Sequence, residues 1–224
     1  MCHNFSVNTP KRNNLIRRIP VYFNEFEVSF DVKPTGTVST WASILHVTKG
    51  GNNNNAGDRL PAIWFVPGTR RLAVFTAHGT NKNFGVTGTA DIPSSVFTNV
   101  HIQQRRMSNN SYEYSIQING NTKHRSINTN PLTIYNAKVY LGDPWYLAAK
   151  AQVKNLVIKS EPTGKDLLTL IIFHEIFMYQ VRQKNAYKSY FIINHFIGKI
   201  FDTNLFRLFR TTPERFILIS RIFG

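Results

Sequence analysis

Two carboxylates on one predicted strand are the first residues in the sequence that could perform chemistry. Glu25 and Glu27 lie two residues apart, so an extended strand places both on one face, roughly 6.6 Å apart along the backbone. Retaining glycosidases hold their two carboxyl groups about 5 to 5.5 Å apart. The strand supplies no companion aromatic platform, so we interpret the pair as a solvated outer face rather than a catalytic dyad.

A loop rich in asparagine, residues 52–58, is the candidate cation site. It offers several amide oxygens and one carboxylate, Asp58, and Ca²⁺ prefers hard oxygen ligands of these kinds. The loop has no second carboxylate at ligand spacing. A second interpretation is a flexible loop in which Asp58 pairs with Arg59 or another nearby base, and both interpretations stay open.

The aromatic residues suggest glycan binding. A sugar site needs an aromatic ring for stacking and amide or carboxylate groups to bond hydroxyls. Trp64 and Trp145, with Asn55 and Asp58, are therefore the candidate ligand-binding residues, and Tyr146 is a further aromatic candidate. The alternative is that the tryptophan rings fill the core, as large aromatics in β-sandwiches usually do.

Signals for enzymatic chemistry are missing from the sequence. None of the seven histidines pairs with another histidine or a cysteine at metal-ligand spacing, and His174-Glu175 lacks the second histidine of a zinc-protease helix. There is neither a glycine-rich phosphate loop nor a nucleophile elbow. Cys2 is the single cysteine, so an intramolecular disulfide is impossible. We predict a protein that is not an enzyme.

The charge distribution argues against a nucleic-acid partner. The formal net charge is +15, yet the basic residues occur singly or as separate doublets such as Arg17-Arg18, Arg70-Arg71 and Arg105-Arg106. Nucleic-acid binding draws on clustered basic residues. Hydrophobic residues make up 42% of the chain and charged residues 17%, which favours a globular protein whose polarity comes from Asn, Thr and Ser.

The elements that position these residues are predicted to be strands. Residues 26–32 alternate, with Phe26 and Phe30 on one face and Glu27 on the other. Asn119-Gly120 predicts a tight hairpin turn. Many short strands without a helical period predict two packed antiparallel sheets. The predicted strands cover residues 26–32, 41–47, 62–66, 71–77, 83–87, 98–105, 112–118, 122–127, 138–141 and 152–158.

The ends of the chain differ from this central part. Residues 1–20 are predicted to be an N-terminal extension, without the apolar segment of a secretory signal. Residues 161–224 form a basic tail rich in Phe and Ile, predicted to be partly helical or disordered, with an amphipathic stretch too short to span a membrane. Two interpretations stay open: a translated non-coding segment, or a tail that contacts a membrane surface or a partner.

Two segments carry a resemblance to a known family. Residues 41–52 (WASILHVTKGGN) with 57–64 (GDRLPAIW), and residues 139–146 (VYLGDPWY) running into 153–158 (VKNLVI), resemble concanavalin A-like, laminin-G-like jelly-roll domains of secreted invertebrate proteins. The resemblance covers residues 21–160. It implies an all-β, two-sheet antiparallel jelly-roll sandwich and an extracellular location.

These observations leave three hypotheses for function. The first is an extracellular recognition module that binds a glycan or a protein, and the second is a structural or interaction domain without a small-ligand site. The third is a carbohydrate-active hydrolase using Glu25 and Glu27. Clustering of Asn55, Asp58, Trp64 and Trp145 around one concavity would favour sugar recognition, whereas burial of both tryptophan rings would favour the structural role.

Overall fold

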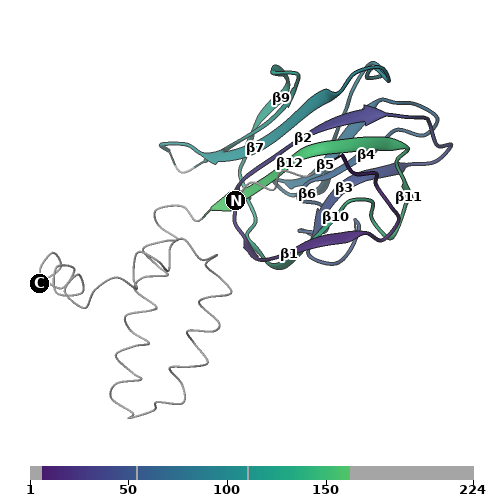
Figure 1. Ribbon diagram of the computed structural model, residues 1–224. Helices are drawn as coiled ribbons and strands as arrows, with labels where there is room; N and C mark the ends of the chain where they lie inside the picture. The colour runs from purple at the N-terminus through teal and green to yellow at the C-terminus, as the bar shows by residue number, and fades with distance from the viewer. Residues whose placement is uncertain (1–6, 54, 110, 162–224) are drawn as a thin grey trace, which may run out of the picture. The chain divides into compact units, whose positions relative to one another are not determined.

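Twelve β-strands in two sheets make up the part of the chain that the structure, a computed structural model, describes: residues 7–53, 55–109 and 111–161 (Figure 1). The first sheet has the order β1 (Leu15–Tyr22), β10 (Ile134–Tyr140), β3 (Ala42–Thr48), β4 (Ala62–Phe65), β5 (Leu72–His78) and β6 (Asn81–Thr87). The short strand β11 (Leu147–Ala148) pairs in parallel with β3. The second sheet has the order β12 (Ala151–Glu161), β2 (Glu25–Pro34), β7 (Thr98–Arg106), β8 (Tyr112–Ile118) and β9 (Asn121–Asn128).

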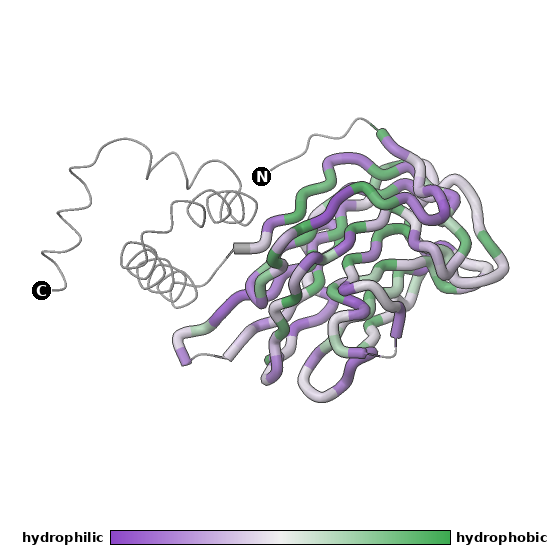
Figure 2. The backbone as a smooth tube through the Cα atoms, turned by 90° about the horizontal axis from the view of Figure 1, so that it is seen from below, coloured by the Kyte–Doolittle hydropathy of each residue, from purple (hydrophilic) through white to green (hydrophobic). Residues whose placement is uncertain are grey.

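The prediction of an all-β, two-sheet antiparallel sandwich is confirmed. Burial alternates without a break along β2, and hydrophobic and hydrophilic residues alternate along many strands in Figure 2. Phe26, Phe30 and Ile116 are all buried in one core, as the period of two requires. Among the described residues no helix is long and apolar enough to cross a membrane. The helix predicted in the tail lies outside the described residues.

The hairpin between β8 and β9 has the predicted turn. Asn119 and Gly120 have φ angles of 50° and 75°. Two successive positive φ angles characterise the type I′ turn, whose twist matches that of the flanking strands. The turn therefore sets the register in which Ile118 faces Asn121.

The first strand begins inside the segment predicted to be an extension. β1 starts at Leu15 and pairs with β10 along its length, and the backbone of Asn8 bonds that of Val153 further upstream. β1 lacks the alternation that marks β2, because Arg17-Arg18 and Pro20 interrupt the pattern. Proline is tolerated on β1 because this strand lies at the edge of its sheet, where a missing N–H breaks no ladder.

Truncating the core should test the packing of the two sheets. Phe30 is fully buried, so Phe30→Ala removes a phenyl ring and leaves a cavity, and we expect a loss of about 3 to 5 kcal/mol in the free energy of unfolding. Urea unfolding followed by circular dichroism measures it. Ser29→Ala, on the opposite face of β2, is the control and should stay within about 0.5 kcal/mol of wild type. A Phe30→Ala protein as stable as wild type would contradict the core.

Candidate functional site

The candidate site lies on the outer face of the first sheet. Leu45, Val47 and Ile63 face the core between the sheets, so His46 and Trp64, which alternate with them, leave the sheet on the opposite side. Two loops, residues 51–58 and 142–147, contact these outer side chains. Together they form a second, partly polar cluster that is separate from the main core.

Asp143 is the hydrogen-bonding centre of this cluster. One carboxylate oxygen lies 3.0 Å from His46 Nδ1 and accepts a hydrogen bond from Trp64 Nε1 at 2.9 Å. The other accepts the backbone N–H groups of Trp145 and Tyr146 at 3.0 and 2.9 Å. The side chain is fully buried. This one carboxylate therefore fixes the turn that carries Trp145 and Tyr146 to β3 and β4.

His46 lies between two hydrogen-bond acceptors. Its Nδ1 faces the Asp143 carboxylate, and its Nε2 lies 2.7 Å from the backbone carbonyl oxygen of Asp58. Both partners are acceptors, so an imidazolium that donates from both nitrogens fits the geometry. The result is a buried ion pair that also holds the end of the Asn-rich loop.

The pKa of Asp143 reflects these contacts. Burial alone would raise it, because desolvation disfavours the charged carboxylate. The hydrogen bonds from His46 and Trp64, the positive charge of His46 and the backbone N–H of Tyr146 outweigh burial and lower the pKa to about 2. Asp143 is therefore ionised at neutral pH.

Arg59, which follows the loop of residues 51–58, joins that loop to the same cluster. Its guanidinium lies 4.5 Å from the centre of the Trp64 ring, donates to Asn52 Oδ1 at 3.1 Å, and also bonds the Asn83 side chain of β6. Desolvation lowers its pKa, opposed chiefly by Tyr146. Asn52 Nδ2 in turn donates to the Tyr146 hydroxyl at 3.3 Å. The two loops are thus bonded to one another as well as to the sheet.

The sequence-predicted residues fall at different depths. Asp58, Trp64 and Trp145 all contact or adjoin His46, the two tryptophan rings at centroid distances of 5.6 and 5.3 Å. Trp64 is only 1% exposed, so its ring cannot stack on a sugar, whereas Trp145 is 36% exposed. Asn55 is exposed on the loop. The structure therefore places Trp64 beneath the site and Trp145 at its surface.

Asp58 turns its carboxylate into its own loop. It accepts the backbone N–H of Asn55 at 2.9 Å, and a Cβ on Gly51 would lie 2.5 Å from either carboxylate oxygen. No group of three or more His, Cys, Asp or Glu side chains suited to a metal ion occurs among residues 7–53, 55–109 and 111–161. Calcium binding at Asp58 stays a prediction.

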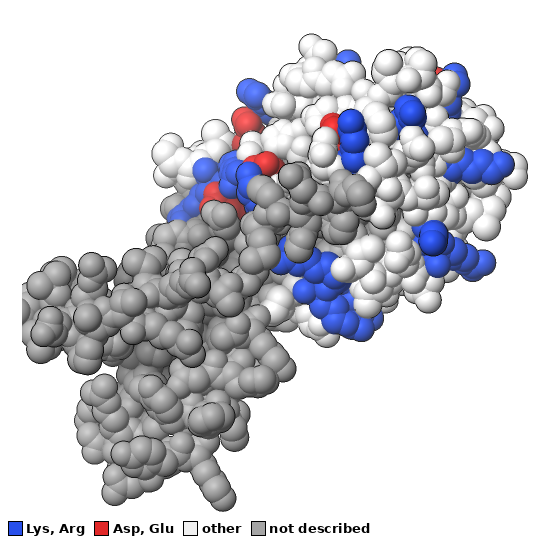
Figure 3. All heavy atoms as spheres, viewed as in Figure 1, with Lys and Arg blue, Asp and Glu red and all other residues white. Residues whose placement is uncertain are grey.

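The carboxylate pair lies on the outer face of the other sheet. Glu25 accepts the backbone N–H of Arg106 at 2.5 Å. Glu27 pairs with Arg105 at 3.0 Å and Lys159 at 3.3 Å. Figure 3 shows Asp and Glu side chains with Lys and Arg among them on this side. Both carboxylates are thus occupied by hydrogen bonds or ion pairs, and the Glu27 side chain is only 16% exposed, so this outer face is less solvated than the sequence predicted.

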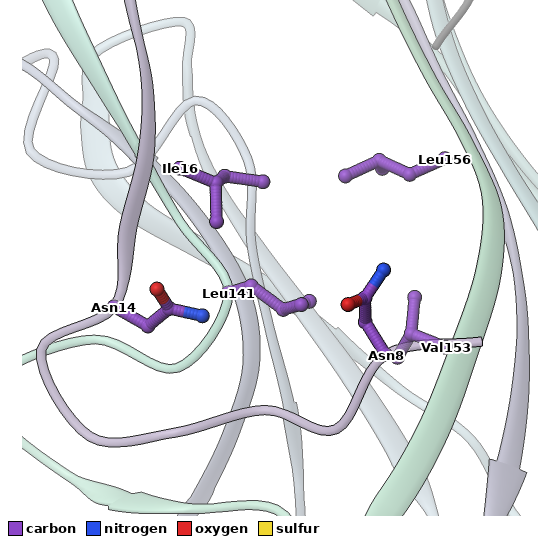
Figure 4. Close-up of a pocket in the computed structure, with 6 residues that line it drawn as sticks. All are labelled: Asn8, Asn14, Ile16, Leu141, Val153 and Leu156. Carbon is purple, nitrogen blue, oxygen red and sulfur yellow. The ribbon is translucent and has the colours of Figure 1, made fainter. Parts of the chain in front are cut away.

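Two hollows adjoin the strands of the first sheet. The smaller, of about 50 Å³, lies where the N-terminal segment meets β12, with Ile16 and Leu156 across it from Asn8 and Val153 (Figure 4). It is far below the 300 to 1,000 Å³ typical of ligand sites. The larger, of about 360 Å³, is an open depression lined by Arg12, Thr40, Trp41, Trp145, Tyr146 and Leu147. We call this the Trp145 depression.

Sequence reasoning missed the residues that build this site. Neither His46 nor Trp41 was predicted to be a site residue, and for His46 the reason is that its partner lies far along the chain: His46 and Asp143 are 97 positions apart. One signal was present, namely a histidine inside the otherwise apolar and small residues of 42–47. A polar ring in a fully buried strand needs hydrogen-bond partners.

Comparisons with known proteins give distant matches to solved structures. No protein-family model matches the chain, and no curated protein matches it. It is similar to a heptameric SAP-like pentraxin from Limulus polyphemus (12% identity, 71% of this chain and 78% of that one, TM-score 0.46). It is also similar to the CBM40 of Ruminococcus gnavus IT-sialidase bound to alpha2,3 sialyllactose (14% identity, 75% of this chain and 99% of that one, TM-score 0.47). A third similar structure is the alginate lyase Aly36B (15% identity, 71% of this chain and 86% of that one, TM-score 0.45). Similarity at this level does not assign a ligand.

The protein class follows from its own strand order. Two antiparallel sheets enclose one core, with the loops of residues 51–58 and 142–147 folded over the outer face of the first sheet. This is a two-sheet antiparallel β-sandwich, an architecture that supports binding and catalytic proteins alike.

The buried ion pair predicts that part of the free energy of unfolding is lost in acid. The folded-state pKa of Asp143, about 2, lies below the ordinary value of 3.8, so its contribution is complete above about pH 4 and is lost as pH falls through about 2. We expect about 2 kcal/mol of unfolding free energy to depend on this group. Urea unfolding from pH 5 to pH 2 measures it.

The matched variants are Asp143→Asn and Asp91→Asn. Asp143→Asn should be less stable at pH 5, because it leaves the His46 charge buried without its partner. Its free energy of unfolding should also lack the acid-dependent decrease of wild type. Asp91, 39% exposed beside Arg70, is the control and should keep the wild-type profile. Identical pH profiles for Asp143→Asn and wild type would contradict the proposed ion pair.

Proposed function

We propose that the protein is a non-catalytic recognition module that binds a glycan in the Trp145 depression. The observation that carries the proposal is the pairing of an exposed indole with a rigid support. Trp145 is 36% exposed at the depression, while its backbone N–H is bonded to the fully buried Asp143. Aromatic rings held in this way stack on the apolar faces of sugar rings.

Polar groups around the depression supply the second requirement of a glycan site. Asn52 donates to the Tyr146 hydroxyl, whose O–H can still donate to a sugar hydroxyl. Arg12 is exposed, with Nε donating to the carbonyl oxygen of Pro144 at 3.3 Å, and Thr40 adds a hydroxyl. Few polar groups beside an aromatic surface are typical of small-ligand sites.

The buried cluster beneath the depression holds the binding side chains in place before a ligand arrives, so binding would cost little side-chain entropy. Trp64 contacts Tyr146 at a ring-centroid distance of 5.2 Å, and Tyr140 contacts Trp145 at 6.2 Å. Side chains that are already immobilised in the unbound protein lose little entropy on binding. A preorganised platform therefore supports recognition of a weakly binding ligand such as a sugar.

A second candidate function is a domain that contacts another protein and has no sugar ligand. Leu147, 47% exposed next to Trp145, favours it, because adjacent apolar side chains are typical of protein-binding surfaces. The burial of Trp64 also fits this alternative. An extracellular location is part of the proposal for both candidates, and it rests on the laminin-G-like resemblance alone.

Glycan-array binding of the full-length chain tests the proposal. We expect binding that Trp145→Ala weakens at least about tenfold, equivalent to about 1.4 kcal/mol, because it removes the stacking surface. Tyr135→Ala is the control: Tyr135 is 72% exposed on β10 but does not line the depression, so its removal should leave binding unchanged. Arrays run with Ca²⁺ and with chelator test the calcium prediction for Asp58.

Two results would overturn the glycan proposal. One is a folded wild-type protein that binds no glycan, and the other is a Trp145→Ala variant that binds as tightly as wild type. Capture of a protein partner whose affinity falls in both Trp145→Ala and Leu147→Ala would support the second candidate instead.

A further inference from the structure

Arg12 supplies the positive charge of the Trp145 depression. The other residues that line the depression are uncharged, namely Thr40, Trp41, Trp145, Tyr146 and Leu147. Arg12 is exposed, and it forms no ion pair with any residue in the described part of the chain. An anionic ligand in the depression would therefore meet this charge without displacing a carboxylate.

Backbone hydrogen bonds fix the segment that carries Arg12. The N–H groups of Lys11, Asn13 and Asn14 donate to carbonyl oxygens of residues 141–143 at 3.0 to 3.2 Å. The carbonyl oxygen of Asn14 in turn accepts a hydrogen bond from the same segment at 2.9 Å. Because that segment begins the turn held by the buried carboxylate, the backbone of Arg12 is held beside the turn as well.

A side-chain hydrogen bond orients the guanidinium. Arg12 Nε–H donates to the carbonyl oxygen of Pro144 at 3.3 Å, and Pro144 directly precedes Trp145 in the chain. Arginine has five N–H donors, so the two Nη groups keep four for a ligand. The guanidinium is therefore tied to the same turn as the exposed indole.

A guanidinium binds anionic groups better than it binds neutral hydroxyls. Two parallel N–H groups match the two oxygens of a carboxylate, and the opposite charges attract one another. A sulfate group likewise presents negatively charged oxygens. A neutral sugar offers only hydroxyl oxygens, which accept hydrogen bonds without a charge, so it gains less from Arg12.

The buried carboxylate beneath the depression already has its own partners. Asp143 is fully buried and lies 3.0 Å from His46 Nδ1, so its charge is compensated before a ligand arrives. The chain as a whole has a formal net charge of +15. Its long-range field therefore also attracts anionic ligands.

We propose that the Trp145 depression prefers acidic glycans to neutral ones. Trp145 stacks on a sugar ring, and Arg12 binds a carboxylate or sulfate group carried by that ring or by the next one. This inference rests on the proposed glycan-binding function, and it adds that the charge of one residue selects the ligand. Salt weakens the contact, because ions screen the interactions of an exposed charge.

Binding of matched acidic and neutral glycans to the full-length chain tests the preference. The pairs are sialyllactose with lactose, trigalacturonate with its methyl ester, and sulfated with unsulfated N-acetyllactosamine, so that carboxylate and sulfate are tested separately. We expect at least one acidic member to bind at least about tenfold more tightly than its neutral counterpart at low salt. Raising NaCl from about 50 mM to about 500 mM should reduce that difference at least about threefold.

Arg12→Gln removes the charge and leaves a polar side chain at the depression. It should lower affinity for the preferred acidic glycan about tenfold and abolish the salt dependence, while affinity for the neutral counterpart stays within about twofold of wild type. Arg18→Gln is the matched control, because Arg18 is an exposed arginine of β1 that does not line the depression. It removes the same charge and should keep the preference. Circular dichroism checks that both variants are folded.

The possible failures of the two proposals can be told apart. Equal binding of the acidic and neutral members of every pair would overturn the acidic preference and leave the glycan-binding function standing. A folded Arg12→Gln protein that keeps the preference, or an equal loss in Arg18→Gln, would also overturn it. A wild-type protein that binds neither member of any pair would overturn both proposals together.

Discussion

The buried carboxylate of Asp143 organises the outer face of the first sheet. A charge without solvent is costly unless hydrogen bonds replace its hydration. Here two side chains and two backbone N–H groups do so, and they come from β3, β4 and the turn itself. Because the four donors come from three parts of the chain, satisfying the carboxylate also determines where the turn of residues 142–147 lies.

Side chains of the same cluster also hold the Asn-rich loop. His46 uses its second nitrogen on the carbonyl oxygen of Asp58, and Arg59 stacks on Trp64 while its guanidinium bonds asparagine side chains. Two loops without regular structure are thereby immobilised on a rigid sheet. Binding residues are commonly found on loops that a scaffold positions in this way. The Trp145 depression is formed where one of these loops meets the start of β3.

Alternating hydrophobicity was sufficient to predict the strands that are buried on one face. β2 shows the period of two in its sequence and again in its burial. Asn119-Gly120 predicted the turn between β8 and β9, because few residue pairs tolerate two successive positive φ angles. β1 was missed, since an edge strand with Arg17-Arg18 and Pro20 has a weaker constraint on its pattern. Periodicity reports burial, and most residues of β1 are only partly buried or exposed.

The depth of each aromatic residue could not be predicted from sequence. Trp64 and Trp145 are the same residue type in similarly apolar surroundings, yet one supports the cluster from below and the other reaches solvent. The difference arises from Asp143, which binds the indole N–H of the first and the backbone of the second. Contacts of this kind join segments far apart in the chain, and no local pattern records them.

The composition of β1 has a consequence for the behaviour of the protein in concentrated solution. An exposed edge strand offers unsatisfied N–H and C=O groups to which a strand of another molecule can add, the usual first step toward aggregation. β1 occupies such an edge, and it carries Pro20, which cannot donate a hydrogen bond, beside two like-charged arginines. A neighbouring copy would therefore meet electrostatic repulsion and an incomplete ladder, both of which oppose pairing of two molecules through this edge.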